Sequence, residues 1–372
     1  MACDNGNNQV PEDVTKEILS RLTVKSLLRF KCVCRHWYFL MKNSSFITKH
    51  HNTTTNSRLI IQHHHYNNLN RAIPILSELI FSSMPPVCYN FDELEMPNNP
   101  EYVIGPLNGI FCLYGRDEDR IFLWNPAIRE LKPVLVLPPK LPPRVDRVYH
   151  FFGFGLDIIS NNLKVVWLRQ FYNEEIQNIY NDTSVALYNL STDSWKLFEI
   201  HLDAISSIIE SLSNTYMNGV YYWMTTENFY NFKILSFDMH NENFQELPGP
   251  PDITESQFGF LATYNGSIVM ILYYPQEVEK YFEIWAMEEK GFWIKQLTVG
   301  PVLDNLCPVG IRDNGDLFGT INTSRLVLYN NHATEINNLG HYNSSKVFIY
   351  KESLVSVKGR KECKERNTMV QA

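Results

Sequence analysis

A weak repeat of roughly 45 to 55 residues most constrains how this 372-residue chain can fold. Each unit carries a glycine turn, a strand, a short strand that ends in an aromatic residue and a polar turn, and a further strand. The five units begin at Gly105, Phe152, Asn218, Asn265 and Asn314. The period is typical of four-stranded propeller blades.

One such blade cannot bury its own faces, and stacking blades around an axis solves that problem. Three further strands are expected at the ends of the repeat, at Arg58–Gln62, Val347–Tyr350 and Ser353–Val357. We expect them to pair and close the ring, which gives an all-β, propeller-like domain of about six blades. An array of β-sandwiches or two stacked sheets remains the alternative.

Residues 10–51 have a different pattern, with 19 apolar residues among 42. Val14, Ile18 and Leu22 follow at i, i+4 and i+8, and Leu19 widens this stripe, which predicts an amphipathic helix. A unit of about 40 residues rarely closes a core without disulfides, metal or a partner. This end of the chain is therefore expected to dock onto something.

Two more short helical pieces are expected, one opening at Leu27 and one running from Phe30 to Met41. The last is apolar over more than half of its circumference, so it should be buried on two sides. One side can pack within the unit and the other would need a second protein. The alternative is that both sides pack against the rest of this chain.

This unit resembles the F-box motif, particularly its plant form. The matching phrases are Pro11–Asp13, Glu17–Leu22, Lys25–Cys34 and Trp37; Val10 and Thr23 depart from the usual Leu and Pro. The resemblance implies binding to a Skp-type adaptor and, through it, to a cullin–RING ubiquitin ligase. The positions that it assigns to the adaptor interface or its immediate support are Pro11, Val14, Ile18, Leu19, Leu22, Leu27, Leu28, Val33 and Trp37.

The repeat region resembles the F-box-associated domain of plants, a relative of Kelch-type repeats, and within it the S-locus F-box proteins of pollen. The matching phrases are Gly153–Asp157, Asn161–Val166, Tyr188–Trp195, Phe237–Met239, Ile284–Met287 and Val347–Leu354. This resemblance implies a non-catalytic receptor that binds pistil S-ribonucleases and directs non-self ones to ubiquitination. An F-box receptor for an unrelated client, or more remotely a propeller enzyme or sugar-binding module, remains an alternative.

Charge is divided unevenly along the chain. Residues 10–51 carry a net charge of +5 and residues 52–357 a net charge of −14. Acidic loops would steer a basic client, although such clusters also serve solubility. The candidate client-binding acids are Asp92, Glu93, Glu95, Asp117, Glu118, Asp119, Glu174 and Glu175. The negative body argues against nucleic-acid binding, which needs the opposite sign.

Metal and cofactor chemistry find little support in the sequence. Cys32, Cys34 and His36 would splay around a helix axis, so core thiols are the preferred interpretation. The run His63–His65 has no Cys or carboxylate partner at a ligand spacing. Cys112 and Cys307 have no evident partners for a copper site. We expect no cofactor and no metal.

The chain divides into an F-box at 10–51 and a propeller domain at 52–357, with disordered ends expected at 1–9 and 358–372. No apolar stretch reaches 18 residues and no leader-like segment begins the sequence, so a membrane-spanning or secreted protein is not expected. Seven scattered cysteines fit a reducing compartment. These features predict a cytoplasmic protein, and the basic tail leaves a nuclear location open.

Overall fold

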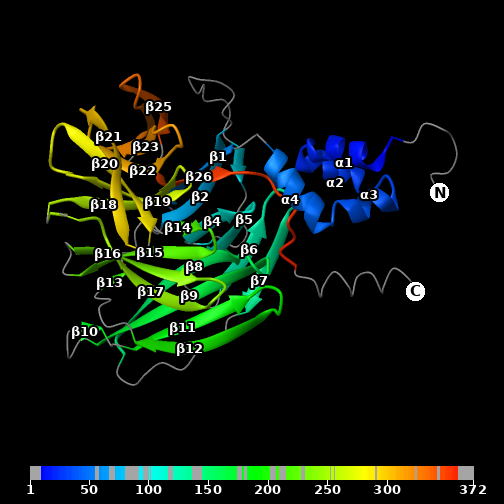
Figure 1. Ribbon diagram of the computed structural model, residues 1–372, viewed down its shortest axis with the longest axis horizontal. Coiled ribbons are helices and arrows are strands. Elements are labelled where there is room, and N and C mark those ends of the chain that lie inside the picture. The colour runs from blue at the N-terminus through cyan, green and yellow to red at the C-terminus, as the bar shows by residue number, and fades with distance from the viewer. Residues whose placement is uncertain are drawn as a thin grey trace.

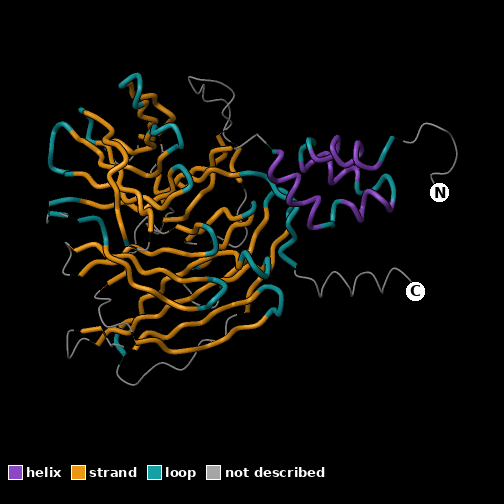
Figure 2. The backbone as a smooth tube through the Cα atoms, viewed as in Figure 1, coloured by secondary structure: helices purple, strands orange, loops and turns teal. Residues whose placement is uncertain are grey.

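Four short helices lie at one end of a ring of β-sheets (Figures 1 and 2). The computed structural model describes residues 10–54, 58–66, 72–79, 92–94, 100, 102–115, 120–135, 145–173, 178–179, 182–201, 207–208, 215–227, 231–251, 253–254, 256–289, 291–322, 325–341 and 344–358. Among these residues, no helix is long and apolar enough to cross a membrane.

The helical unit has one helix more than the three expected. The helices are α1 (Glu12–Ser20), α2 (Val24–Phe30), α3 (Arg35–Leu40) and α4 (Ser44–Thr53). The helix predicted from Phe30 to Met41 is confirmed only in its second half, as α3; residues 31–33 form a turn and Cys34 has an extended backbone with φ −154°. α4 was missed; it begins where the Asn43 side chain accepts a hydrogen bond from the Ser45 amide, 2.8 Å long.

Five sheets each come from one continuous stretch of chain. In the first two, the strands are β4 (Tyr102–Leu107), β5 (Ile110–Tyr114), β6 (Arg120–Asn125) and β7 (Glu130–Leu135), then β8 (Arg147–Asp157), β9 (Asn162–Asn173), β10 (Asn178–Ile179), β11 (Asp182–Asn189) and β12 (Ser194–His201). The third holds β13 (Ser207–Ile208), β14 (Thr215–Met217), β15 (Val220–Glu227), β16 (Asn231–Asp238) and β17 (Asn243–Pro248). The last two hold β18 (Phe258–Tyr264), β19 (Ser267–Tyr273), β20 (Lys280–Glu289) and β21 (Phe292–Val302), and β22 (Leu306–Ile311), β23 (Leu317–Ile321), β24 (Arg325–Asn330) and β25 (Glu335–His341).

Five blades are thus each built from one continuous stretch of chain, one fewer than the six blades expected. A further sheet completes the ring, and its strands come from both ends of the domain. Its strands are β26 (Ser344–Tyr350), β1 (Arg58–Tyr66), β2 (Ala72–Leu79) and β3 (Asp92–Leu94), in that order. The expected pairing of Arg58–Gln62 with Val347–Tyr350 is confirmed, with Leu59 opposite Ile349. The strand expected at Ser353–Val357 is absent, because those residues pair with no strand.

Turn chemistry explains why these stretches fold as hairpins. The Asn218–Gly219 and Asn265–Gly266 pairs have positive φ at both residues, from 48° to 88°, as tight two-residue turns require. The polar turns predicted after the aromatic residue form in four of the five units; in the fourth unit β20 continues past Trp285 to Glu289. Asn189 and Asn330, for example, accept hydrogen bonds from the backbone amides two and three residues later. The local sequence therefore fixes where each strand reverses.

The core lies between the sheets rather than within any one of them. Trp223 of β15 packs against Phe151 of β8, and Leu261 of β18 packs against Met224 of β15. Similar apolar clusters join every neighbouring pair of sheets, including the composite sheet to β4–β7 and to β22–β25. The innermost strands, β4, β8, β14, β18, β22 and β26, each contact the next in a closed ring. This is the stacked arrangement that blades need to bury both faces.

Candidate functional site

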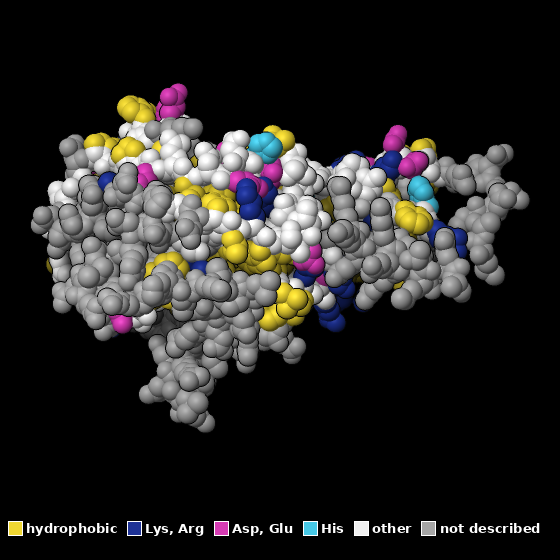
Figure 3. Space-filling model, turned by 90° about the horizontal axis from the view of Figure 1, so that it is seen from below, with side chains coloured by type: hydrophobic (Ala, Val, Ile, Leu, Met, Phe, Trp, Pro, Cys, Tyr) yellow, Lys and Arg dark blue, Asp and Glu magenta, His cyan; other side chains and the backbone are white. Residues whose placement is uncertain are grey.

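The first helix presents an apolar face that the rest of the described chain leaves uncovered. Val14 and Ile18 lie one turn apart on α1 and are 46% and 54% exposed. Leu19, on the other side of the same helix, is only 2% exposed and lies in the core of the helical unit. Figure 3 shows hydrophobic side chains reaching the surface of this helical end. The division into two faces is the one that the sequence predicts for a docking helix.

The other predicted adaptor residues fall into three groups. Leu27 is fully buried, while Leu22, Leu28 and Trp37 are half-buried against the same core, so all four support the surface from beneath. Pro11 and Val33 are exposed, the latter by 61%.

Phe39 is 60% exposed on α3 and was missed by sequence reasoning. The sequence did contain a signal for this residue, because Phe39 lies on the helix expected to be apolar on two sides.

The helical unit shares its core with the propeller. Leu354, at the C-terminal end of the described chain, is 4% exposed and lies among Leu19, Val24 and Leu27. The β6–β7 turn also contributes Ala127 and Ile128 to this cluster. The alternative that both sides of the third helix pack against the rest of this chain is therefore wrong: the helical unit packs on the propeller through its core, while Phe39 of α3 and the α1 face stay exposed among the described residues.

Residues 351–357, which we call the strap, form hydrogen bonds with both the propeller and the helical unit. The Asn125 side-chain amide donates to the Ser353 carbonyl at 3.1 Å and to the Val355 carbonyl at 2.8 Å. Glu352 accepts the Val24 amide at 3.3 Å and pairs with Arg58 at 3.0 Å. These bonds replace the sheet pairing that was expected for this segment, and they join the two domains in one packed body.

The propeller has two rims, of which one faces the helices. The β6–β7 turn contacts the helical unit, so the opposite ends of the same strands, at Tyr102, Tyr114, Arg120 and Leu135, lie on the other rim, which we call the distal rim (Figure 1). Corresponding strand ends in the other sheets share this rim because neighbouring blades stack in the same orientation.

The predicted client-binding acids cannot be compared directly with this geometry. Asp92 and Glu93 lie in β3, but their side chains are outside the described residues, as are Glu95, 117–119 and 174–175 altogether. Along the chain, 117–119 falls between the distal-rim residues Tyr114 and Arg120.

Exposed apolar side chains also gather at distal-rim strand ends and the connections between them. They are Tyr102, Leu135, Tyr149, Phe258, Val278, Tyr281 and Leu303, with exposed fractions from 37% to 84%. A rim with large exposed apolar and aromatic groups is typical of a protein-binding surface.

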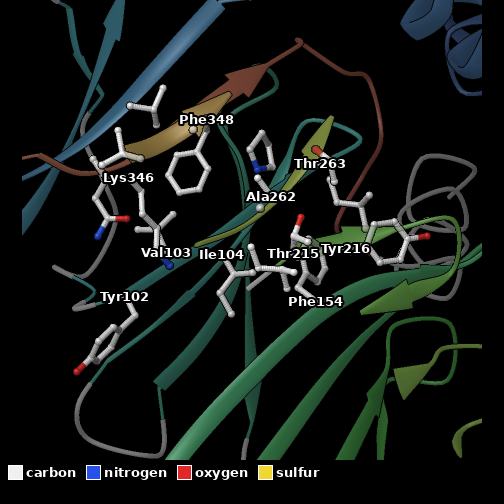
Figure 4. Close-up of a pocket in the computed structure, with 18 of the residues that line it drawn as sticks. Tyr102, Val103, Ile104, Phe154, Thr215, Tyr216, Ala262, Thr263, Lys346 and Phe348 are labelled. Atoms are coloured by element: carbon white, nitrogen blue, oxygen red, sulfur yellow. The ribbon is translucent and has the colours of Figure 1, made fainter. Parts of the chain in front are cut away.

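A cavity of about 440 Å³, which we call the channel, lies at the centre of the ring and is lined mainly by the innermost strands (Figure 4). Its lining includes Lys346 and Phe348 of β26, Ile104 of β4, Phe152 of β8 and Thr215 of β14. Channels of this size admit small molecules.

The cysteine positions weighed for metal chemistry have other surroundings. Within the described residues, no group of three His, Cys, Asp or Glu side chains is placed to hold a metal ion. Cys112 is fully buried, and burial raises the pKa of its thiol to about 12, so it stays protonated. Gly153 and Gly155 lie in β8, where a Cβ would come within 2.6 Å of Trp223 and 2.4 Å of Met239, so they serve blade packing.

Comparison with known families agrees with this architecture. Residues 8–49 match the F-box domain, and residues 90–366 match the F-box associated beta propeller domain. The chain is 27% identical over 316 residues to the F-box/kelch-repeat protein At3g23880 of Arabidopsis thaliana, covering 82% of this chain and 84% of that protein. It is 24% identical over 331 residues to the putative F-box/kelch-repeat protein At1g12870 of the same plant, covering 83% and 75%.

A solved structure, a putative 6-phosphogluconolactonase from Bacteroides fragilis, aligns with 9% identity and a TM-score of 0.41, over 80% of this chain and 99% of that one. That likeness is too low to bear on function. The two family matches, by contrast, span most of the chain. The chain therefore belongs to the F-box proteins that carry an F-box associated β-propeller domain.

Proposed function

We propose that this protein is the client-recognition subunit of a Skp–cullin–F-box ubiquitin ligase, with its client bound at the distal rim of the propeller. An F-box domain implies binding of a Skp-type adaptor and, through it, a cullin–RING ligase. The observation that carries the proposal is the uncovered Val14–Ile18 face of α1, on a unit whose other side is already packed against the propeller.

The mechanism that follows is proximity. The adaptor binds at the helical end and the client at the distal rim, and the shared core around Leu354 holds the two at a fixed separation. A ubiquitin-charged enzyme of the ligase then meets client lysines at high effective concentration. This mechanism assigns no bond chemistry to the chain itself, which acts in the cytoplasm or nucleus.

The test is adaptor co-purification with variants of the exposed face. Val14→Glu with Ile18→Glu should weaken adaptor binding by about ten- to a hundredfold, because it puts charge into a desolvated interface. Both side chains are exposed, so the fold should survive; Leu19 is unsuitable because it is buried. Ile159→Glu, at a 71% exposed propeller position, is the matched control and should bind normally. Undiminished adaptor binding by the double variant would sink the proposal.

For the client, we propose a basic protein, and specifically an S-ribonuclease of the pistil. The resemblance to the pollen S-locus group and the net charge of −14 across residues 52–357 support this choice. Association of the full chain with purified S-ribonuclease should slow as salt rises, because long-range attraction between opposite charges is screened. Affinity purification from native tissue with the proteasome inhibited is the decisive measurement. Recovery of an acidic or non-ribonuclease client would favour an unrelated F-box receptor.

A further inference from the structure

The central channel carries a positive charge in a domain that is otherwise strongly acidic. Lys346 of β26 lines the channel, and none of the described lining residues is an aspartate or a glutamate. The remaining titratable lining groups are His150 and the tyrosines Tyr102, Tyr114, Tyr216 and Tyr221. Since residues 52–357 carry a net charge of −14, this sign reversal is a local property of the channel.

Lys346 has no counter-charge among the described residues. It is half-buried, and because it lines the channel, its exposed part faces that space. Desolvation lowers the pKa of its ammonium to about 8, so the group remains mostly protonated at neutral pH. The His150 Nδ1 accepts a hydrogen bond from the Trp167 indole N–H, with 3.1 Å between the two nitrogens.

A second polar group stands beside the lysine. Gln62 of β1 is directly opposite Lys346 in the β1–β26 register, which puts the two side chains on the same face of the sheet. Gln62 is 4% exposed and lines the channel, and its side-chain oxygen accepts no hydrogen bond. A buried unpaired acceptor is costly, and a ligand donor would relieve that cost.

Most of the remaining wall is apolar. Ile104, Phe152 and Phe348 supply hydrocarbon surface, and Figure 4 shows Phe348 beside Lys346 at one side of the cavity. The Tyr216 hydroxyl donates to the Leu156 carbonyl at 2.8 Å and accepts the Gly219 amide at 2.9 Å, so it has little further capacity. Lys346 therefore supplies the charge of the described wall, and Gln62 supplies its buried unpaired acceptor.

From this geometry we propose that the channel is a binding site for a carboxylate on a small apolar body. The Lys346 ammonium would hold the carboxylate, Gln62 would accept a hydrogen bond from a hydroxyl or amide of the ligand, and the aromatic walls would cover its apolar part. The acid can be a free small molecule or the carboxyl terminus of a peptide. The proposal does not depend on adaptor binding or on the identity of the client.

The experiment uses the full chain co-purified with its adaptor. Binding of benzoate, phenylacetate, 3-(3-hydroxyphenyl)propanoate, 2-naphthoate and hexanoate is measured by ligand-observed NMR and calorimetry, each against its primary amide. A parallel arm compares acetyl-Ala-Phe with a free carboxylate and with an amidated end. Lys346→Met is the test variant. The control is Lys295→Met, an exposed lysine of β21 that pairs with Glu283 on the outside of its blade.

We expect at least one acid to bind more tightly than its amide, and Lys346→Met to weaken it by about ten- to a hundredfold, the worth of one charge-assisted hydrogen bond. Lys295→Met should leave binding unchanged, and both variants should retain the adaptor. Preference for the acetyl-Ala-Phe acid over every free acid would identify a peptide terminus as the natural source. Equal binding of all acids and amides, or acid binding that persists in Lys346→Met, overturns the proposal.

Discussion

Truncating Leu354 tests whether the F-box borrows part of its core from the far end of the propeller domain. Leu354 is 4% exposed and packs with Leu19, Val24 and Leu27 of the helical unit, although it lies on the strap. Leu354→Ala removes three heavy atoms from that cluster. The strap keeps its backbone hydrogen bonds from Asn125, so the change is confined to packing.

The expected loss of stability in Leu354→Ala follows from the burial of this side chain. Leu→Ala at a closed core site costs about 2 to 5 kcal/mol, the lost transfer energy plus the cavity that remains. Taking about 3 kcal/mol, the open population of the helical unit should rise by roughly a hundredfold or more. The blades distant from the junction do not contact Leu354, so their stability should change little. A small helical unit cannot compensate, because its remaining core is only a handful of side chains.

Hydrogen exchange read by mass spectrometry measures this directly. Peptides from α1, α2 and α4 should exchange about a hundredfold faster in Leu354→Ala, while peptides from β18 to β21 keep wild-type rates. Leu303→Ala, at a 71% exposed leucine of the propeller, is the control and should change neither region. Excess adaptor should restore protection of the helices by binding the folded form. Unchanged exchange in α1, α2 and α4 of the variant would refute the shared core.

Four further substitutions probe the junction and the blades. Asn125→Ala leaves two strap carbonyls without donors and should destabilise the protein by about 2 to 3 kcal/mol in urea unfolding. Gly109→Ala should cost at least about 2 kcal/mol, because φ is +75° and the new Cβ would lie 2.5 Å from a strap side chain; Gly266→Ala, at φ +73° with nothing within 4 Å, should cost about half as much. Burial alone would raise the pKa of Asp157, but hydrogen bonds from the following turn and the Lys164 ammonium outweigh it and lower that pKa to about 2. Because the folded pKa lies below the unfolded one, Asp157→Asn should lose about 2 kcal/mol at neutral pH, and this difference from wild type should shrink as pH falls from about 4 to 2.

Predictions from local sequence succeeded where adjacent residues decide the geometry. The Asn–Gly pairs at 218–219 and 265–266 form the expected turns because these residues tolerate positive φ. The break in the third expected helix was not predictable in the same way. Its apolar residues suit either one helix or two, and the turn at 31–33 forms because both halves must pack on one small core.

The two candidate sites differ in the same way: local sequence predicts one of them, and only packing creates the other. The exposed positions of Val14 and Ile18 follow from helical period and from a motif match, both properties of a short segment. Lys346, by contrast, is an ordinary lysine in a strand, and no spacing rule marks it. Its role depends on a ring that places it opposite Gln62, at the other end of the domain.

The hairpins, the blade repeat and the helical docking unit follow from local sequence, since each depends on contacts between residues close along the chain. Three features depend instead on the folded ring: Leu354 completes the F-box core, the strap bonds to Asn125 rather than to a strand, and the channel carries a lone ammonium among its described lining residues. Closing a ring joins its two ends, and the side chains that meet there are separated by most of the domain, so no local pattern records their contact.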